Sequence, residues 1–237
     1  MFKTIAIHQP NFLPWPGYFL KIASCDVFVF HDNVQITKRG YTRRTKISSN
    51  KLFEESQWLT VPLKKHSDFA LIKDLEISWD IDWPQKHLNQ IKSTYYGCPR
   101  FDEFFKILSY WYQQVKEIGY LSDMNIFLIR QILKELGIEK EIFKSSELPV
   151  SGKATSYNLA ITQYLNGTQY LCGNGASKYQ DDQRFLDHHI HVKHLDAMQN
   201  LGNEFLNINL QVSIIDLFMN VEIDAIRNVF RKFAMNG

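Results

Sequence analysis

The sequence predicts an α/β fold with a parallel or mixed sheet that is opened by a βαβ unit. Two short apolar runs, residues 4–7 and residues 27–30, are rich in β-branched and aromatic side chains, which is typical of buried strands. Between them, residues 18–23 carry apolar side chains at helical spacing, directly after Pro16 and Gly17. A strand, a helix and a second strand in this order indicate two parallel strands joined by a crossover helix.

The rest of the chain is expected to be helical in the middle and alternating at the end. Strands are expected at residues 58–63 and 72–77. Amphipathic helices are expected at residues 83–95, 101–112 and 123–136, and Gly137 is a natural stop for the last of them. In the last third of the chain, the apolar pattern predicts a helix at residues 156–165 and strands at residues 169–172 and 189–194. It also predicts closing helices at residues 213–221 and 223–233.

Length and composition favour one cytoplasmic domain. The chain has 237 residues, of which 45% are hydrophobic, and this is enough apolar mass for one core. We expect one α/β domain over residues 1–237, with a helical insertion or subdomain at about residues 83–137. A net charge of +2 is too balanced to indicate a nucleic-acid-binding protein. The three cysteines form no CxxC pair, and no apolar run suits a signal peptide or a membrane span.

Polar residues follow both strands of the βαβ unit. His8 and Gln9 come after the first strand, and Asp32 and Gln35 come after the second. Because ligands bind beyond the carboxyl ends of parallel strands, we expect these residues at one ligand-binding edge. His8 is either a general base or ligand contact, or a histidine bonded into the turn. Asp32 is either a general base, a ligand for an acceptor amine or a metal, or a turn cap.

The densest cationic stretch comes next, at Lys38, Arg39, Arg43 and Arg44. Arginine binds phosphate through two parallel hydrogen bonds, so this stretch predicts contact with the diphosphate of a nucleotide-linked or lipid-linked sugar. The phosphates of an aminoacyl-tRNA would fit as well. The alternative is an ordinary solvated surface.

Later parts of the chain offer weaker candidates. His87 shares a helix face with Tyr95, where a histidine is either a packed core residue or part of the site. Ser177 ends a Gly-Asn-Gly-Ala-Ser turn whose backbone N–H groups suit a phosphate or an oxyanion. The histidines between His188 and His194 form either an ordinary strand or a zinc site without a nearby cysteine. Cysteines 25, 98 and 172 lie in apolar contexts typical of buried thiols, and thioester chemistry is the alternative for each.

The opening of the chain resembles that of WbqC-like proteins. The likeness lies in IHQPNFLPWPGYF at 7–19, DVFVFHDNVQ at 26–35, KRGY at 38–41, WLTVP at 58–62 and WPQKHL at 83–88, and more loosely in residues 173–179 and SIIDL at 213–217. The resemblance implies a role in making bacterial surface polysaccharide, especially O-antigen, and a transfer of glycine onto a sugar. It supplies no settled catalytic residues, and the histidine patch departs from the family pattern.

Together, the residues and the resemblance predict an acyl or aminoacyl transferase that modifies an amino sugar or another sugar intermediate. The predicted catalytic residues are His8, Asp32 and His87. The predicted substrate-binding residues are Gln9, Asn11, Tyr18, Gln35, Lys38, Arg39, Arg43, Arg44, Tyr95 and Ser177. The expected partner is a nucleotide-linked or lipid-linked sugar, with an aminoacyl donor that the sequence does not identify.

Two other functions remain open at this point. The first is an ATP-dependent amide ligase that acts through an acyl-adenylate and uses ATP and magnesium. It is suggested by the order of elements, which is similar in layout to the opening of pantothenate synthetase, although the His-x-Gly-His signature is absent here. The second is a non-enzymatic protein that binds nucleotide sugars or glycans through the aromatic side chains of residues 12–19.

Overall fold

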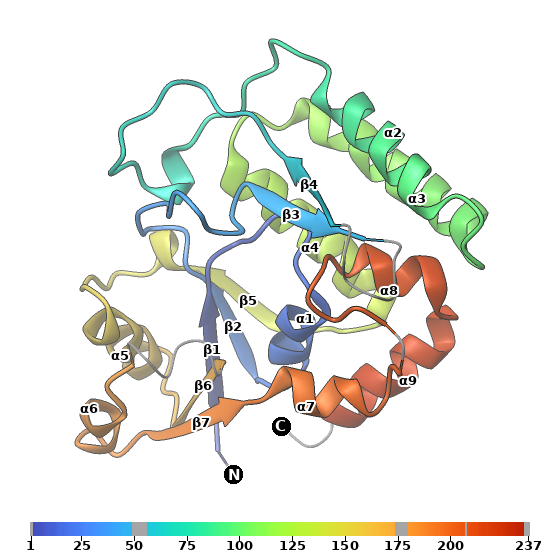
Figure 1. Cartoon of the computed structure of the whole chain (residues 1–237). Helices are drawn as coiled ribbons and strands as arrows, with labels where there is room; N and C mark the ends of the chain where they lie inside the picture. The colour runs from blue at the N-terminus through green and yellow to red at the C-terminus, as the bar shows by residue number, and fades with distance from the viewer. Residues whose placement is uncertain (1, 49–55, 174–179, 207, 235–237) are drawn as a thin grey trace.

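A five-stranded parallel sheet with the order β5-β2-β1-β6-β7 forms the centre of the molecule (Figure 1). The computed structural model describes residues 2–48, 56–173, 180–206 and 208–234. The strands are β1 (Thr4–His8), β2 (Val27–Phe30), β5 (Glu141–Lys144), β6 (Gln169–Gly173) and β7 (His191–Leu195). The α/β fold predicted from the sequence is therefore confirmed, with this sheet parallel throughout.

The βαβ opening is also confirmed. Helix α1 (Pro16–Ala23) connects β1 to β2, and these strands pair in parallel with His8 opposite Phe30. Pro16 stands in the first turn of α1, where a missing N–H breaks no helical bond and the fixed φ of proline suits the helix. Because β1 and β2 end at the same edge, the polar residues that follow them begin at that edge.

Helices cover both faces of the sheet. Ala6 and Phe28 belong to one hydrophobic cluster, whereas Ile5 and Val27 belong to another, because successive side chains of a strand point to opposite faces. The first face carries α1, α7 (Ala197–Gly202) and α9 (Ile223–Ala234), and α1 contacts both of the others. The second face carries α5 (Thr155–Tyr164) and α6 (Asp182–Leu186) (Figure 1).

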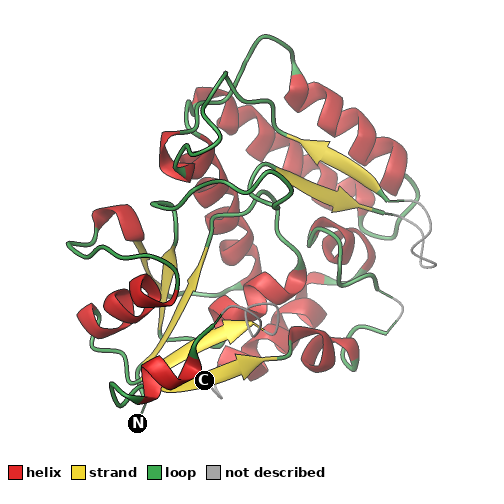
Figure 2. Ribbon diagram, turned by 60° about the vertical axis from the view of Figure 1, so that its left-hand side comes forward, coloured by secondary structure: helices red, strands yellow, loops and turns green. Residues whose placement is uncertain are grey.

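A second sheet, the antiparallel pair of β3 (Arg44–Ile47) and β4 (Gln57–Thr60), lies apart from the main sheet (Figure 2). Beside it is the central helical segment of α2 (Trp83–Tyr95), α3 (Phe101–Gln114) and α4 (Leu121–Leu136), and α8 (Ile215–Asn220) contacts α3. The short 3-10 helices are η1 (Ile72–Asp74), η2 (Val115–Glu117) and η3 (Ser145–Glu147). Gly137 ends α4 with a φ of 67°, a left-handed conformation that glycine adopts without strain. None of the described helices is long and apolar enough to cross a membrane.

The prediction of a strand at residues 72–77 is wrong. The segment begins with the 3-10 helix η1, and its later residues make only isolated bridges, from Glu76 to Tyr120 and from Ile77 to Leu63. The apolar side chains are buried as the alternating pattern requires, but their backbone groups bond to separate segments of the chain. No continuous ladder of hydrogen bonds forms. The apolar pattern of these residues therefore reflects their burial and does not indicate a strand.

Other strand boundaries also differ from the sequence pattern. Strand β7 begins at His191, because His189 has a φ of 59° and lies in the preceding turn. Strands β3 and β5 have no pattern that predicts them, since each has four residues and two of these carry charge. Their pairing partners supply the reason for strand structure at these positions.

Candidate functional site

A pocket of about 430 Å³ lies at the carboxyl edge of the main sheet. Strands β1, β6 and β7 border it through His8, Gly173 and Leu195. Its other lining residues come from α1 and α7 and from the residues just before these helices; they are Trp15, Gly17, Tyr18, Lys21, Asp196, Ala197 and Met198. The chain leaves β1 toward β2 and later returns to β6 on the other side of β1, so β1 and β6 form the topological switch point of the sheet. Ligands of open α/β sheets bind at this point, which makes the pocket the candidate site.

Lys21 places a buried cation in the wall of the pocket. Its side chain is buried, and Nζ donates a hydrogen bond to the backbone oxygen of Ile7 at 2.8 Å. No carboxylate in the described part of the chain forms an ion pair with Lys21, whose ammonium donates to a backbone oxygen instead. Burial lowers the pKa of Lys21 to about 8. A desolvated ammonium without a carboxylate partner suits an anionic group that arrives with a substrate.

Sequence reasoning missed Lys21 because it lies inside the apolar helical run. The available signal was its spacing from Gly17, since residues four apart lie on the same face of a helix. A Cβ at Gly17 would lie 2.7 Å from the Cβ of Ala197, so this face of α1 packs closely on α7. A lysine on a packed helix face is a buried charge, and such charges are rare without a function or a partner.

His8 lies beside Lys21 at the end of β1. Its ring contacts the rings of Tyr18 and Trp15 at centroid distances of 4.8 and 5.8 Å. Burial, and then the charge of Lys21, lowers the pKa of His8 to about 3, so the imidazole is neutral at pH 7. Nδ1 lies 3.2 Å from the backbone oxygen of Gln9. We assign the proton to Nδ1 on this contact, which leaves Nε2 as a hydrogen-bond acceptor.

The predicted binding residues Gln9, Asn11 and Tyr18 hold the loop that follows β1. Tyr18 donates its hydroxyl proton to the backbone oxygen of Gln9 at 2.9 Å, and Thr42 donates to the side-chain oxygen of Gln9 at 3.3 Å. Asn11 is buried. Burial raises the pKa of Tyr18 well above its usual value, so the phenol stays protonated. Of these three residues, Tyr18 lines the pocket, whereas Gln9 and Asn11 do not.

Asn125 on α4 joins this loop to the basic segment. Its side-chain nitrogen donates to the backbone oxygens of Pro10 and Thr42, at 2.8 and 2.7 Å. The side chain is fully buried, so both bonds are shielded from water. The two polar loops predicted to converge at the strand ends therefore share one buried anchor.

Asp32 lies at the end of β2, where it binds the turn after β5. Its carboxylate accepts hydrogen bonds from the Ser145 hydroxyl at 3.0 Å, from the Ser146 backbone N–H at 2.9 Å and from the Ser146 hydroxyl at 2.6 Å. The side chain is buried, and it is not among the residues that line the pocket. These contacts are those of a carboxylate that joins two neighbouring strand ends.

Replacing Asp32 with asparagine is expected to lower the free energy of unfolding by about 2 kcal/mol, because an amide nitrogen cannot accept the bonds that one carboxylate oxygen accepts. Urea unfolding measures this change, with the exposed Asp68→Asn as the control. Turnover per folded molecule is expected to stay within about twofold of the wild type. A large loss of turnover at unchanged stability would instead identify Asp32 as a general base.

His31, which sequence reasoning did not select, lies next to Asp32 and within electrostatic range of His8. Burial, together with the charge of Lys21, lowers its pKa to about 4 against the opposing effect of Asp32. Its ring lies 4.9 Å from that of Tyr157, and Nδ1 is buried without a hydrogen-bond partner in the described residues. The ends of β1 and β2 thus carry two neutral histidines.

His87 and Tyr95 lie elsewhere, in the core between α2, α3 and β4. His87 Nε2 is 3.1 Å from the backbone oxygen of Thr60, and Nδ1 is 3.3 Å from the hydroxyl of Tyr112. Burial lowers the pKa of His87 to about 4. The hydroxyl of Tyr95 accepts a hydrogen bond from the Ser48 backbone at 3.3 Å. The structure therefore does not bring these two residues to the pocket.

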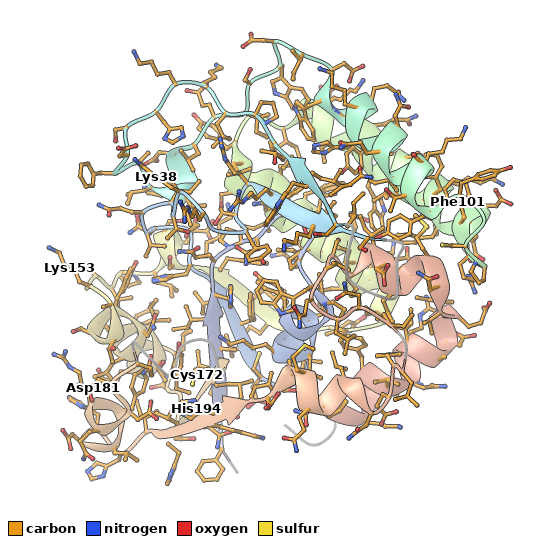
Figure 3. All side chains as sticks on the ribbon, in the orientation of Figure 1. Lys38, Phe101, Lys153, Cys172, Asp181 and His194 are labelled. Carbon is orange, nitrogen blue, oxygen red and sulfur yellow. The ribbon has the colours of Figure 1, made fainter. Side chains whose placement is uncertain are left out.

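The basic segment divides into surface and packed residues. Lys38 pairs with Asp68 at 2.9 Å on the surface, and Figure 3 places it among the outer loops. Arg44 donates to the backbone oxygens of Gly40 and Arg39, and its guanidinium lies 4.2 Å from the ring centroid of Trp58. The guanidinium is thereby held over an aromatic face.

An aromatic path links this arginine to the pocket. The ring of Tyr41 lies 5.7 Å from that of Trp58 and 5.6 Å from that of Trp15, which lines the pocket. Arg39 and Arg43 have no side-chain ion pair in the described parts of the chain. Cationic and aromatic side chains therefore run from the pocket toward β3 and β4.

The remaining predicted residues lie outside the pocket or outside the described chain. Gln35 is exposed and makes an isolated bridge with Leu71. Ser177 lies outside the described residues. The histidine patch is dispersed: His188 contacts the backbone of Arg184, while His194 contacts Cys172. Within the described ranges, no group of three or more histidine, cysteine or acidic side chains is arranged to hold a metal ion.

Comparisons with known proteins agree with this organisation. The model of the WbqC-like protein family matches residues 9–228, which run from the residue after β1 through the helical segment to the first half of α9. The chain is 29% identical over 226 residues to the uncharacterised protein Rv1507c of Mycobacterium tuberculosis (strain ATCC 25618 / H37Rv), across 94% of this chain and 96% of that protein. No solved structure matches it significantly. The family model covers most of the chain, and the protein belongs to the WbqC-like family.

Proposed function

We propose that the protein transfers an acyl or aminoacyl group to the amine or hydroxyl of a sugar intermediate in the pocket between β1 and β6. The observation that carries this proposal is the buried ammonium of Lys21 in a pocket at the switch point of the sheet. A sugar substrate is supported by the surface-polysaccharide role that the family resemblance implies. Cytoplasmic synthesis of O-antigen intermediates is the corresponding setting.

Lys21 and His8 have complementary roles in this proposal. When the acceptor nitrogen or oxygen attacks the acyl carbonyl, negative charge develops on the carbonyl oxygen, and the Lys21 ammonium stabilises it. His8 Nε2 accepts the proton that the acceptor loses. Burial is the main cause of the low pKa of His8, and an anion bound beside Lys21 offsets the smaller contribution of the Lys21 charge. The imidazole therefore becomes a stronger base when substrate is bound.

The aromatic path supports a sugar nucleotide as the acceptor. Trp15 presents an aromatic wall to the pocket, and Tyr41 and Trp58 continue this wall outward. Aromatic faces pack on sugar rings, and the guanidinium of Arg44 at the far end suits a phosphate. The predicted roles of Arg43 and Arg44 remain part of this proposal.

An ATP-dependent amide ligase is the second candidate, and the position of α1 favours it. The first residues of α1 line the pocket, and no side chain caps the helix N-terminus. The N-terminus of a helix carries partial positive charge and unpaired N–H groups, which bind phosphates. In this version, Lys21 contacts a phosphate of ATP, and magnesium accompanies the nucleotide.

Replacing His8 with glutamine is expected to reduce kcat for transfer by about 100-fold, because the variant loses a proton acceptor and keeps a polar side chain. The assay uses UDP- and dTDP-linked amino sugars as acceptors, and as donor either glycine with ATP and magnesium or a glycyl thioester. The control is the exposed His66→Gln variant. If His8→Gln were as active as the control, His8 would not be the proton acceptor. If transfer required ATP, the protein would be the amide ligase.

A further inference from the structure

Strands β6 and β7 bring a cysteine, a histidine and an aspartate into one chain of contacts. Cys172 lies opposite His194 in the parallel pairing of these strands, and both are labelled side by side in Figure 3. Cys172 Sγ is 3.2 Å from His194 Nδ1, and His194 Nε2 is 2.7 Å from a carboxylate oxygen of Asp182 at the start of α6. A thiol, a base within hydrogen-bond reach and a carboxylate that orients the base form the arrangement used in thiol catalysis.

The surroundings of Asp182 leave its carboxylate free to orient His194. The second carboxylate oxygen, Oδ1, is buried and has no hydrogen-bond partner among the described residues. His194 is therefore the main partner of this carboxylate, and the contact holds the imidazole ring in place beside the thiol.

The thiol of Cys172 requires such a base. Cys172 is buried, and burial raises the pKa of its thiol to about 11, against an opposing effect of Lys21. The thiol is therefore neutral at pH 7, and it becomes a nucleophile only when a neighbouring group removes its proton. His194 is in contact with the sulfur and is placed to do so.

The other two cysteines show what distinguishes Cys172. Cys25 is also buried, but its thiol donates to the backbone oxygen of Ile22 at 3.3 Å. Neither Cys25 nor Cys98 contacts a histidine in the described parts of the chain. Both are therefore ordinary packed thiols, and they serve as internal controls.

The triad lies at the same carboxyl edge of the sheet as the candidate pocket, but the side chains of Cys172 and His194 point to the opposite face from those of their neighbours that line it. Gly173 follows Cys172 and Leu195 follows His194, and both of these neighbours line the pocket. We propose that Cys172 takes the acyl group of an activated ester or thioester donor as a thioester, with His194 as its base and Asp182 as a positioning residue. This inference rests on the proposed transfer function and adds a covalent intermediate to it.

The reaction balances in two steps. In the first, the Cys172 sulfur attacks the donor carbonyl, a C–S bond forms and the bond to the leaving oxygen or sulfur breaks. The thiol proton passes through His194 to the leaving group. In the second step, the sugar amine attacks the thioester, a C–N bond forms and the C–S bond breaks. The proton of the amine passes to the Cys172 sulfur through His194, which restores the resting triad.

The test uses p-nitrophenyl acetate as a small activated ester, with intact-mass and peptide mass spectrometry. Wild type and the control Cys25→Ser are expected to gain one acetyl group on Cys172 and to release one equivalent of p-nitrophenolate. Cys172→Ser and Cys172→Ala are expected to lose this label, with circular dichroism confirming that at least one of them is folded. His194→Gln is expected to acetylate about 100-fold more slowly.

Absence of a thioester in the wild type, equal labelling of the three cysteines, or a label that persists in Cys172→Ala would overturn the triad. The same experiments distinguish failure of the proposed transfer function from failure of the triad. If Cys172 is acetylated but amino sugar nucleotides neither bind nor discharge the thioester, the triad stands and the sugar acceptor is wrong. If these nucleotides bind in a Lys21-dependent way and no thioester forms, the triad alone is wrong.

Discussion

Replacing Lys21 with methionine is expected to reduce kcat/KM for transfer by about 1,000-fold, which is the loss typical of removing a donor that stabilises an oxyanion. Methionine keeps the unbranched shape of the side chain and removes the charge. The lowered pKa of Lys21 shows that burying the ammonium is unfavourable. Relief from this offsets the lost hydrogen bond to Ile7, so the free energy of unfolding is expected to change by less than about 1 kcal/mol.

Transfer kinetics and urea unfolding of the same preparation measure the two effects of Lys21→Met. The matched control is Lys92→Met, because Lys92 is exposed on α2 and lies outside the pocket. We expect the control to keep wild-type kinetics. A Lys21→Met enzyme with turnover within about threefold of the wild type would show that the buried cation does not act in the reaction.

Replacing Asn125 with alanine is expected to lower the free energy of unfolding by about 3 kcal/mol. The amide nitrogen satisfies two buried carbonyl groups, those of Pro10 and Thr42, and alanine leaves both without a donor. Each buried acceptor left unpaired costs about 1–3 kcal/mol. Because these carbonyls belong to the two loops at the strand ends, turnover is expected to fall as well.

Urea unfolding of Asn125→Ala and of the exposed Asn228→Ala on α9 checks this expectation. The control is expected to change stability by less than about 1 kcal/mol, since its side chain is solvated and alanine favours a helix. If Asn125→Ala were as stable as the control, the two loops would be held by other contacts. The role of Asn125 as their shared anchor would then be wrong.

The parts of the fold that follow from local chemistry were predictable from the sequence. Strands β1 and β2 are short apolar runs whose residues are buried on both faces, and this composition is typical of central parallel strands. Helix α2 spans the residues predicted for it, because Asp82 caps its N-terminus and Pro84 stands in its first turn. Such signals lie within a few residues of the structure they specify.

The candidate site depends on contacts between distant segments, and these were less predictable. The burial of Lys21 follows from the return of β6 to the side of β1, which no local pattern encodes. The contact between Cys172 and His194 depends on the register of β6 and β7. Asp32 was expected at the site because it follows a strand. The structure joins it instead to the turn after β5, a strand of four residues with charged ends.

The most direct test of the account is calorimetric titration of UDP- and dTDP-linked amino sugars into the wild type and Lys21→Met, with Arg43→Ala/Arg44→Ala in parallel. We expect a member of this set to bind the wild type, with affinity lowered by about 10- to 100-fold in Lys21→Met through the loss of one charge-assisted contact. Equal affinity of the wild type and Lys21→Met, or no binding to the wild type, would contradict the assignment of the pocket between β1 and β6 as the sugar site.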